Sequence, residues 1–521
     1  MPELQLTSSA EQQRTKSNEQ PAMTSGSQDD GSLADKGLYY ALIFGILISY
    51  LLVALKHRVI PQVDDSAIYY RYITQFANGH GIVYNHGGPH VYGCSCILYV
   101  LVMAILVRCG VIMTSASYIV NLTGTCFAAY LLFGLVYRSI PNQQLRLLAA
   151  VTSTAFALFQ ARALTWSTQG MECGLHLALL VSVIWAFEKK KPNLCGLLLG
   201  IAIISKLDAI ALAIPLLAIG LIVDYKSTKQ TITSMIAVLI PWICWSTWYF
   251  GSPLPSSFRA KEMHEYSTAG HTFIRAYLSY WPILAMAIAS AVSSRTRFGA
   301  TMLSFLITYI LLYDFTTKHS GFPWYFYVSD FVLWALAGLL PTLLLDRIIE
   351  RIRQLPRKRA TTTAVFSILA ILLVVYCAVR MDVSRITRQS RWLIEGAGHM
   401  ELDRTRVGRF IGNFSSKGEI LSSGHGWPQY LSHLTIYDPT GINDPYYLQK
   451  PGLRKRRPIA QYIVDEVPRL NIFNLHPRHK LIAEWDASFA KTSKVWALWA
   501  LPSSSIATKF ANTKLPLQNP I

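Results

Sequence analysis

Two adjacent carboxylates, Asp64 and Asp65, follow the first long apolar run of the sequence, residues 38–55. A carboxylate that takes the proton of a hydroxyl turns that hydroxyl into an effective nucleophile. Asp is also a common N-cap residue, so a cap for a helix over 66–77 is the structural alternative. A cap needs only one carboxylate and leaves the second unexplained. We therefore predict that Asp64 and Asp65 form a catalytic acid pair at a membrane surface.

Several basic residues are placed where they could meet a phosphate group. Lys206 interrupts the apolar run 193–223 two residues before Asp208, and the segment 251–266 is a proline-containing loop with two closely spaced cations. Cations over a lipid surface suit a phosphate or another anionic head group. A structural ion pair between Lys206 and Asp208 is the alternative. The candidate phosphate-binding residues are Lys206, Lys261, Arg259 and Arg71, and the resemblance described below implies that this phosphate belongs to a sugar donor.

Other polar residues have two interpretations that the sequence leaves open. Glu172 opens the apolar run 173–187, and the helix dipole alone would stabilise an acid there. His80, His86 and His90 could ligate a metal, although their H-x5-H-x3-H spacing matches no common metal motif. The cofactor is therefore unknown, and a divalent metal cation is one option. The further site candidates are Glu172, Asp208 and His80.

The composition indicates a polytopic α-helical membrane protein. Of the 521 residues, 52% are hydrophobic and 15% are charged, whereas about a quarter is charged in soluble domains. Several apolar runs approach the roughly 20 residues that span a bilayer. The net charge of +19 would suggest nucleic acid in a soluble protein. In a membrane protein basic residues gather in cytoplasmic loops, so we predict membrane lipids as partners and no nucleic acid.

The positions of Lys and Arg predict the topology. Basic residues fall in alternate loops between the apolar runs, which makes those loops cytoplasmic. A cytoplasmic N-terminus then places the loop 56–115 outside, with 95–107 lying in the interface instead of crossing. The prediction is about eleven spans plus this interfacial helix. The alternative makes 95–107 a true span and puts either the basic loops or the acid pair on the opposite side.

The long apolar run 193–223 predicts two short helices rather than one. A single helix of that length would be about 45 Å long, more than the hydrocarbon core. A tight turn at 205–208 would bring Lys206 to the same face of the membrane as the acid pair.

Three regions follow from these patterns. Residues 1–36 are polar and predict a disordered cytoplasmic tail. Residues 37–379 form the transmembrane catalytic domain. Residues 380–521 are long enough for an extracytoplasmic soluble domain, α/β or β-rich, with strand-like runs GEILSS, TIY, QYIV and KVWALWA. Its aromatic residues favour binding of an acceptor glycan, or else they fill its own core: Trp392, Trp427, Tyr430, Tyr437, Tyr446 and Tyr447.

The motifs resemble those of the GT-C superfamily of polyprenyl-phosphate-dependent glycosyltransferases, and most of all the bacterial branch with terminal arabinofuranosyltransferases. The resemblance begins with the acid pair, Arg71 and GHGIVYN at 79–85. It continues in TQGMECGLHLALL (168–180), the run 197–217, WYFGSPLPSSFRAKE (248–262) and IYDPTGINDP (436–445). Two departures leave the substrate open. HVYGCSC, with Cys94 and Cys96, replaces a stretch with Glu and Pro, and Lys206 stands where Arg is usual and cannot form a bidentate phosphate contact.

The resemblance implies an activity and a location. The expected reaction transfers a sugar, with inversion, from a polyprenyl-phosphate donor to an extracytoplasmic glycan or lipid-linked acceptor of the cell envelope. The resemblance implies Asp64 as general base, with Asp65 as its partner or as a contact to acceptor or metal. The expected location is the cytoplasmic (inner) membrane, with the active site and C-terminal domain extracytoplasmic. The alternatives are a transporter or flippase of a lipid-linked sugar, and an inactive GT-C-like scaffold.

Overall fold

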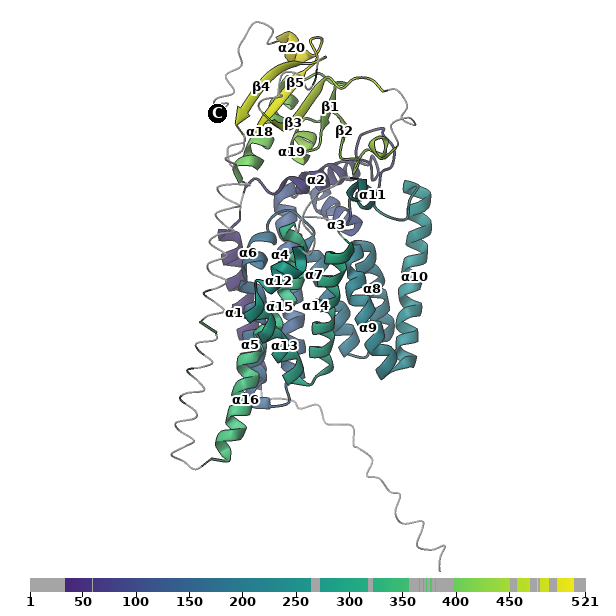
Figure 1. The fold of residues 1–521 in the computed structure, drawn as a ribbon. Coiled ribbons are helices and arrows are strands. Elements are labelled where there is room, and N and C mark those ends of the chain that lie inside the picture. The colour runs from purple at the N-terminus through teal and green to yellow at the C-terminus, as the bar shows by residue number, and fades with distance from the viewer. Residues whose placement is uncertain are drawn as a thin grey trace, which may run out of the picture.

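The computed structural model describes most of the chain (Figure 1). The described residues are 33–58, 60–263, 272–316, 322–355, a few positions between 365 and 380, 398–449, 457–468, 476, 478–486 and 494–509. Nearly all of the predicted tail 1–36 and most of the predicted span 361–379 lie outside these residues, as does Trp392.

The apolar runs form helices close to the predicted boundaries, and these helices stand side by side in one bundle (Figure 1). The packed interior of the bundle holds side chains from nearly every helix, because most of these helices are apolar on more than one face. The bundle helices are α1 (Leu33–Lys56), α4 (Met113–Ser139), α5 (Gln143–Phe159), α6 (Ala161–Trp166), α7 (Cys173–Glu188), α8 (Pro192–Ser205), α9 (Ile210–Val223), α10 (Tyr225–Phe250), α12 (Thr272–Leu278), α13 (Trp281–Ser294), α14 (Arg297–Thr316), α15 (Phe326–Ala337) and α16 (Leu340–Arg353).

Among the described residues, five helices are long and apolar enough to cross a membrane. The count rises to six if α12 and α13, which are bent by 84° at their junction, form one span. Four further apolar helices have 10–17 residues, among them α3 (Ile97–Arg108) in the segment predicted to lie in the interface. The chain is therefore an integral membrane protein, and the full count of eleven spans stays a prediction.

The predicted hairpin in 193–223 is confirmed. Helix α8 ends at Ser205, Lys206 is extended with φ −159° and ψ 129°, and the 3₁₀ turn η1 (Leu207–Ala209) leads into α9. The polar residues Ser205, Lys206 and Asp208 interrupt the apolar run here, and the chain leaves the helical conformation where their side chains find polar partners at the bundle end.

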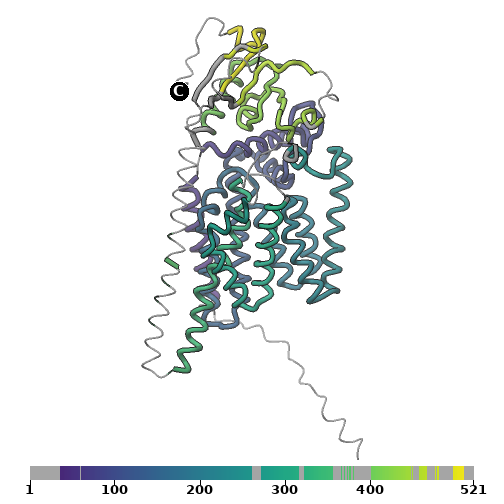
Figure 2. The backbone as a smooth tube through the Cα atoms, viewed as in Figure 1, coloured from purple at the N-terminus to yellow at the C-terminus, as the bar shows by residue number. Residues whose placement is uncertain are grey.

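Helix α2 (Asp64–Ala77) begins at the predicted acid pair and lies across one end of the bundle, beside α3. Figure 2 shows this early part of the chain between the bundle and the C-terminal residues. Helix α11 (Ser256–Met263) lies at the same end (Figure 1). We call this the proximal end of the bundle, since it faces residues 398–509, which we call the C-terminal unit.

The C-terminal unit is built on a five-stranded sheet with strand order β2-β1-β3-β5-β4. Strands β1, β2 and β3 are parallel, whereas β5 is antiparallel to both β3 and β4. The four strand-like runs of the sequence are confirmed as strands, and β4 is a fifth that was not predicted. The elements are α18 (Gly398–Phe414), β1 (Ile420–Ser423), α19 (Gly426–Leu431), β2 (Thr435–Tyr437), β3 (Tyr462–Pro468), β4 (Lys480–Asp486), β5 (Lys494–Ala500) and α20 (Ser505–Lys509).

The basic loops gather at the distal end of the bundle, away from the C-terminal unit. Arg297 at the start of α14 donates to Glu188 Oε1 at the end of α7, at 3.2 Å. Asn142 before α5 donates to Asp346 Oδ1 of α16 at 2.7 Å, and Figure 1 shows α16 extending away from the C-terminal unit. The acid pair and the basic loops therefore lie at opposite ends of the bundle.

Candidate active site

Asp64 faces the C-terminal unit and holds it by its carboxylate. Its Oδ2 accepts a hydrogen bond from the amide of Gly426 and its Oδ1 one from the amide of Trp427, both at 2.9 Å. The guanidinium of Arg404 lies 3.7 Å from Oδ2 and the ring of His425 lies 3.8 Å from it. Because α19 begins at Gly426, Asp64 supplies the acceptors that the first amides of that helix need.

These contacts keep Asp64 ionised. Burial alone would raise its pKa, but Arg404, His425 and the amide of Trp427 together hold the pKa of the carboxyl well below its usual range. A carboxylate with a low pKa is a weak proton acceptor. In the folded chain both oxygens of this carboxylate are occupied by amides of α19.

Glu401 on α18 also pairs with Arg404, but its pKa is shifted upward, opposite to the shift of Asp64. Its Oε1 pairs with Arg404 at 3.0 Å, and its side chain is almost fully buried. Burial raises the pKa of Glu401 to about 8, with Arg404 opposing the shift and Asp64 adding to it. One of the two carboxyl groups around Arg404 is thus protonated at neutral pH.

The packing of α18 against α2 should therefore weaken as the pH rises. The folded chain binds a proton at Glu401 between pH 4.5, its ordinary pKa, and about 8. As the pH rises through this window, the free energy of unfolding falls by at most about 1.4 kcal/mol per pH unit, and it levels off above pH 8. Hydrogen exchange of α18, expressed as protection factors that remove the intrinsic acceleration of exchange with pH, should show weaker protection at pH 9 than at pH 6. Glu401→Gln should abolish the difference in protection, and Asp403→Asn on the same helix should keep it; equal protection at the two pH values in the wild type would contradict the assignment.

Asp65 belongs to a different face of α2. It lies one turn before Tyr69, so the two side chains share a face of the helix. The Tyr69 hydroxyl is 2.9 Å from Ser95 Oγ, and its ring packs edge-on against Tyr99 of α3 with centroids 5.4 Å apart. Burial and the nearby carboxylate of Glu172 raise the pKa of Tyr69 well above its usual value. This face of α2 therefore points toward the bundle and toward Glu172.

A cluster of charged side chains lies at the proximal end, around Lys206. Its ammonium is 3.0 Å from Glu172 Oε1 and 3.7 Å from Asp208 Oδ2. Asp208 Oδ1 lies 2.7 Å from His176 Nε2, and its Oδ2 accepts hydrogen bonds from Tyr313 at 2.6 Å and Tyr309 at 3.2 Å. Ionisable groups at the membrane edge are costly and are kept where they serve a function. We call these residues, Glu172, His176, Lys206 and Asp208, the lysine cluster.

Small residues and turns bring the lysine cluster together. Gly170, with φ +79°, reverses the chain just before Glu172, a conformation that favours glycine. A side chain at Gly174 would lie 2.0 Å from the Asn121 carbonyl, so α7 and α4 can approach only because Gly174 has none. On the other side, Ser205 Oγ lies 3.1 Å from Cys96 Sγ, which ties the Lys206 turn to the start of α3.

The cation of the lysine cluster is partly exposed. Lys206 retains 12% of its side-chain exposure while Glu172 retains 2%. The Tyr69 hydroxyl of α2 interacts with the carboxylate of Glu172, so the cluster also contacts α2.

Not every predicted site residue reaches this cluster. Arg71 is buried and donates to the carbonyl oxygens of Tyr84, Gln429 and Leu434 and to Asn85 Oδ1, so it joins the first loop to the C-terminal unit. The structure thus brings together Lys206, Glu172 and Asp208, with Asp65 on the facing helix. His176 is part of the cluster although it was not among the predicted site residues; its place four residues after Glu172 is the one sequence signal for it.

Three further candidates lie elsewhere. Arg259 is exposed on α11, and the side chain of Lys261 lies outside the described part. His80 is exposed, with its Nδ1 2.8 Å from Gln75 Oε1 and its ring 4.0 Å from that of His86.

No group of three or more His, Cys, Asp or Glu side chains in the described ranges is arranged to hold a metal ion. We therefore derive no step through a metal.

The fold is similar to that of ArnT from Cupriavidus metallidurans. The crystal structure of ArnT bound to undecaprenyl phosphate matches with a TM-score of 0.54 and 15% identity, covering 90% of this chain and 98% of that one. The apo structure matches with a TM-score of 0.57 and 15% identity, covering 91% and 99%. No protein-family model and no curated protein matches the sequence. From the first bundle helix to the C-terminal unit, the chain has an ArnT-like fold.

Proposed function

We propose that this protein is a membrane glycosyltransferase that transfers a sugar from a polyprenyl-phosphate donor to a glycan or lipid-linked acceptor, with inversion. One observation carries the proposal: Tyr69, one turn after Asp65 on α2, interacts with Glu172 of the lysine cluster at the proximal end of an ArnT-like bundle. ArnT has been crystallised with undecaprenyl phosphate, and the sequence motifs resemble enzymes that use such donors.

The contacts of α2 support a division of roles between its two carboxylates. The sequence-based prediction makes Asp64 the base, but its two oxygens accept amides of the C-terminal unit and its pKa is low. We assign Asp64 to hold that unit over the site, and Asp65, which shares a face with Tyr69, to take the acceptor proton. The acceptor oxygen bonds to the anomeric carbon as the bond from that carbon to the phosphate oxygen breaks. The proton passes to Asp65, and the polyprenyl phosphate leaves with the bonding electron pair.

Lys206 is the cation proposed for the leaving phosphate. Glu172 and Asp208 hold its ammonium in place before the donor binds, so little reorganisation is needed when charge develops. Arg259 and Lys261, both on α11 at the proximal end, are the further cations of the proposal.

The function is tested with the purified chain in lipid vesicles and radiolabelled polyprenyl-phosphate sugars. A transferase releases polyprenyl phosphate and labels an acceptor in equal amounts. A transporter moves the intact lipid-linked sugar between leaflets and releases none, and an inactive scaffold does neither.

The proposed orientation places the acid pair and the C-terminal unit on the extracytoplasmic side. Cysteine at position 78, which is exposed just after α2, should react in intact cells with a membrane-impermeant maleimide. Cysteine at position 189, exposed in a basic loop, should react only after permeabilisation. Both variants are made without the native cysteines, and the reverse pattern would overturn the orientation.

A further inference from the structure

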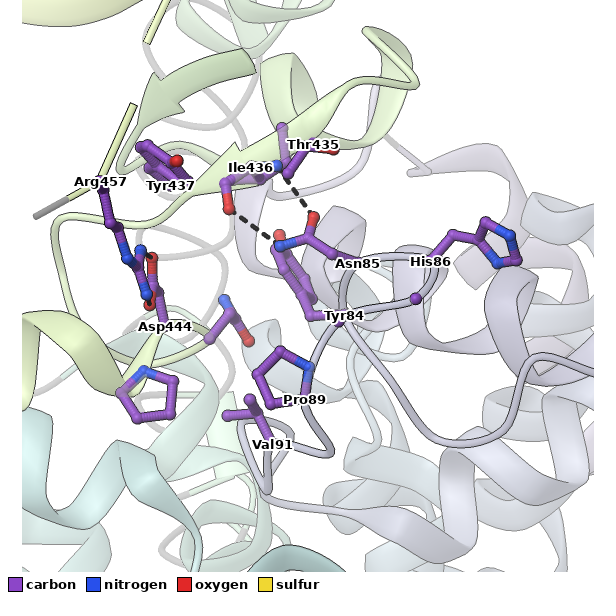
Figure 3. A pocket seen from close by; sticks show the side chains of 14 residues that line it. Tyr84, Asn85, His86, Pro89, Val91, Thr435, Ile436, Tyr437, Asp444 and Arg457 are labelled. Carbon is purple, nitrogen blue, oxygen red and sulfur yellow. Dashed lines mark hydrogen bonds and ion pairs between the residues drawn. The ribbon is translucent and has the colours of Figure 1, made fainter. Parts of the chain in front are cut away.

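A pocket of about 230 Å³ lies between the first loop and the C-terminal unit (Figure 3). One wall is the segment 84–91, which follows α2, and the other is the segment 435–445 together with Arg457. It is somewhat smaller than the roughly 300–1,000 Å³ of typical small-molecule sites. A pocket of this size has room for one ring of an oligomeric ligand, whose other units would lie outside it.

Both walls are held rigidly. Asn85 pairs with the backbone of Ile436 in both directions, donating from Nδ2 to the carbonyl oxygen and accepting from the amide at Oδ1, each at 2.9 Å (Figure 3). Asp438 is buried and accepts hydrogen bonds from Thr440 and from the backbone and side chain of Asn443, which fixes the turn of the second wall. A ligand would therefore bind without first ordering the loops, which saves conformational entropy.

The polar groups of the pocket are balanced in charge. Arg457 forms a bidentate pair with Asp444, at 2.6 Å and 2.9 Å, and its guanidinium lies 4.9 Å from the ring centroid of Tyr437 and 3.9 Å from that of Tyr446. Asn443 is 3% exposed, and its Oδ1, which faces Gly93, accepts no hydrogen bond within the described residues. Figure 3 shows Tyr437, Arg457 and Asp444 along one side and Pro89 and Val91 along the other.

This combination selects one chemical class of ligand. A phosphate would meet an Arg457 already neutralised by Asp444, and an apolar ligand would leave the Asp444–Arg457 pair without water. A neutral sugar offers hydroxyls for the carboxylate, guanidinium and amide, and apolar ring faces for tyrosine and proline. We propose that the pocket binds one neutral sugar unit of the acceptor.

The pocket is connected to the proposed reaction centre through α2. Arg71 donates to Asn85 on the pocket wall, and it lies six residues, about 9 Å, along α2 from Asp65. Arg71 shares a face of α2 with Asp64, seven residues before it, whereas Asp65 lies on a different face, so a glycan seated in the pocket reaches the proposed base by crossing over α2. The inference thus rests on the proposed function and adds where the acceptor is recognised.

The test uses the full-length protein in nanodiscs and two neutral probes, xylotriose and mannotriose, with inorganic phosphate as the charged probe. Saturation-transfer NMR should show contact with at least one trisaccharide and none with phosphate. Tyr437→Ala should remove this signal and raise the KM for the acceptor about tenfold, with kcat and the KM for the donor unchanged. Tyr437→Phe, which keeps the ring, should behave like the wild type, and Leu402→Ala on α18, outside the pocket, is the matched control.

The possible results distinguish a wrong assignment of the pocket from a wrong assignment of the protein's function. Transfer with an unchanged acceptor KM in Tyr437→Ala would overturn the pocket and leave the glycosyltransferase in place. Trisaccharide binding that depends on Tyr437, in a chain that transfers nothing, would keep the pocket and overturn the function. Absence of any trisaccharide signal in the folded wild type, or a signal from phosphate instead, would also overturn the pocket.

Discussion

Asp65→Asn should lower the transfer rate by about a hundredfold or more, the usual contribution of a general base. The amide keeps the size of the side chain but cannot accept the acceptor proton at neutral pH. Because Asp65 is half-buried on the face of α2 that carries Tyr69, the substitution should leave the contacts of the C-terminal unit unchanged. Transfer is measured with radiolabelled donor at saturating acceptor, and binding of the donor should be unaffected.

Asp64→Asn is the matched variant, and it should weaken the contact with the C-terminal unit, which Asp65→Asn leaves intact. Its side-chain nitrogen cannot accept from an amide, so either Gly426 or Trp427 loses its partner, at a cost of roughly 1–3 kcal/mol. Hydrogen exchange at these two amides should accelerate, whereas in Asp65→Asn it should not. If Asp65→Asn stays active and Asp64→Asn is inactive with exchange at Gly426 unchanged, Asp64 is the base and the division of roles is wrong.

Lys206→Met should lower transfer by about a hundredfold to a thousandfold, as when one donor to a developing oxyanion is removed. Lys206→Arg keeps the charge and should retain part of the activity. Lys226→Met, which removes an exposed cation from the distal start of α10, should leave transfer unchanged. The measurement is transfer at saturating donor, so that weakened donor binding is separated from slower chemistry.

Loss of the lysine also leaves two buried carboxylates without their cation. Removing one partner of a buried pair costs roughly 3–5 kcal/mol, so Lys206→Met alone could fail to fold. The double variant Lys206→Met/Glu172→Gln restores the charge balance and should melt near the wild-type temperature while remaining inactive. A folded and fully active double variant would reduce the lysine cluster to a structural ion pair.

The local patterns of the sequence predict the elements well. The turn at 205–208 follows from one lysine inside a run too long for a single helix, and four strands follow from short apolar or aromatic runs between turns. Strand β4 was not predicted, since KLIAEWD carries charges at both ends and lacks a clear alternation. These features depend on neighbours in the chain.

The site depends on contacts that no local pattern encodes. Asp64 meets Gly426 across 362 positions of sequence, and Arg71 meets Gln429 across 358. A basic residue beside an acid pair predicts a phosphate contact, and only the fold shows that Arg71 binds backbone carbonyls instead. Likewise the sequence pairs Lys206 with Asp208, whereas the nearer partner is Glu172, on another helix.

The four acceptors of Arg71 have a consequence for how such proteins diverge. Two lie in the first loop, at Tyr84 and Asn85, and two in the C-terminal unit, at Gln429 and Leu434. A single side chain thus holds both segments by hydrogen bonds at once. Backbone carbonyls are present whatever the side chains are, so substitutions in the C-terminal unit leave the acceptors at Gln429 and Leu434 in place, whereas an insertion or deletion between them would displace one. The C-terminal unit can therefore diverge freely in sequence while its chain length at this contact is fixed by an arginine more than 300 residues away.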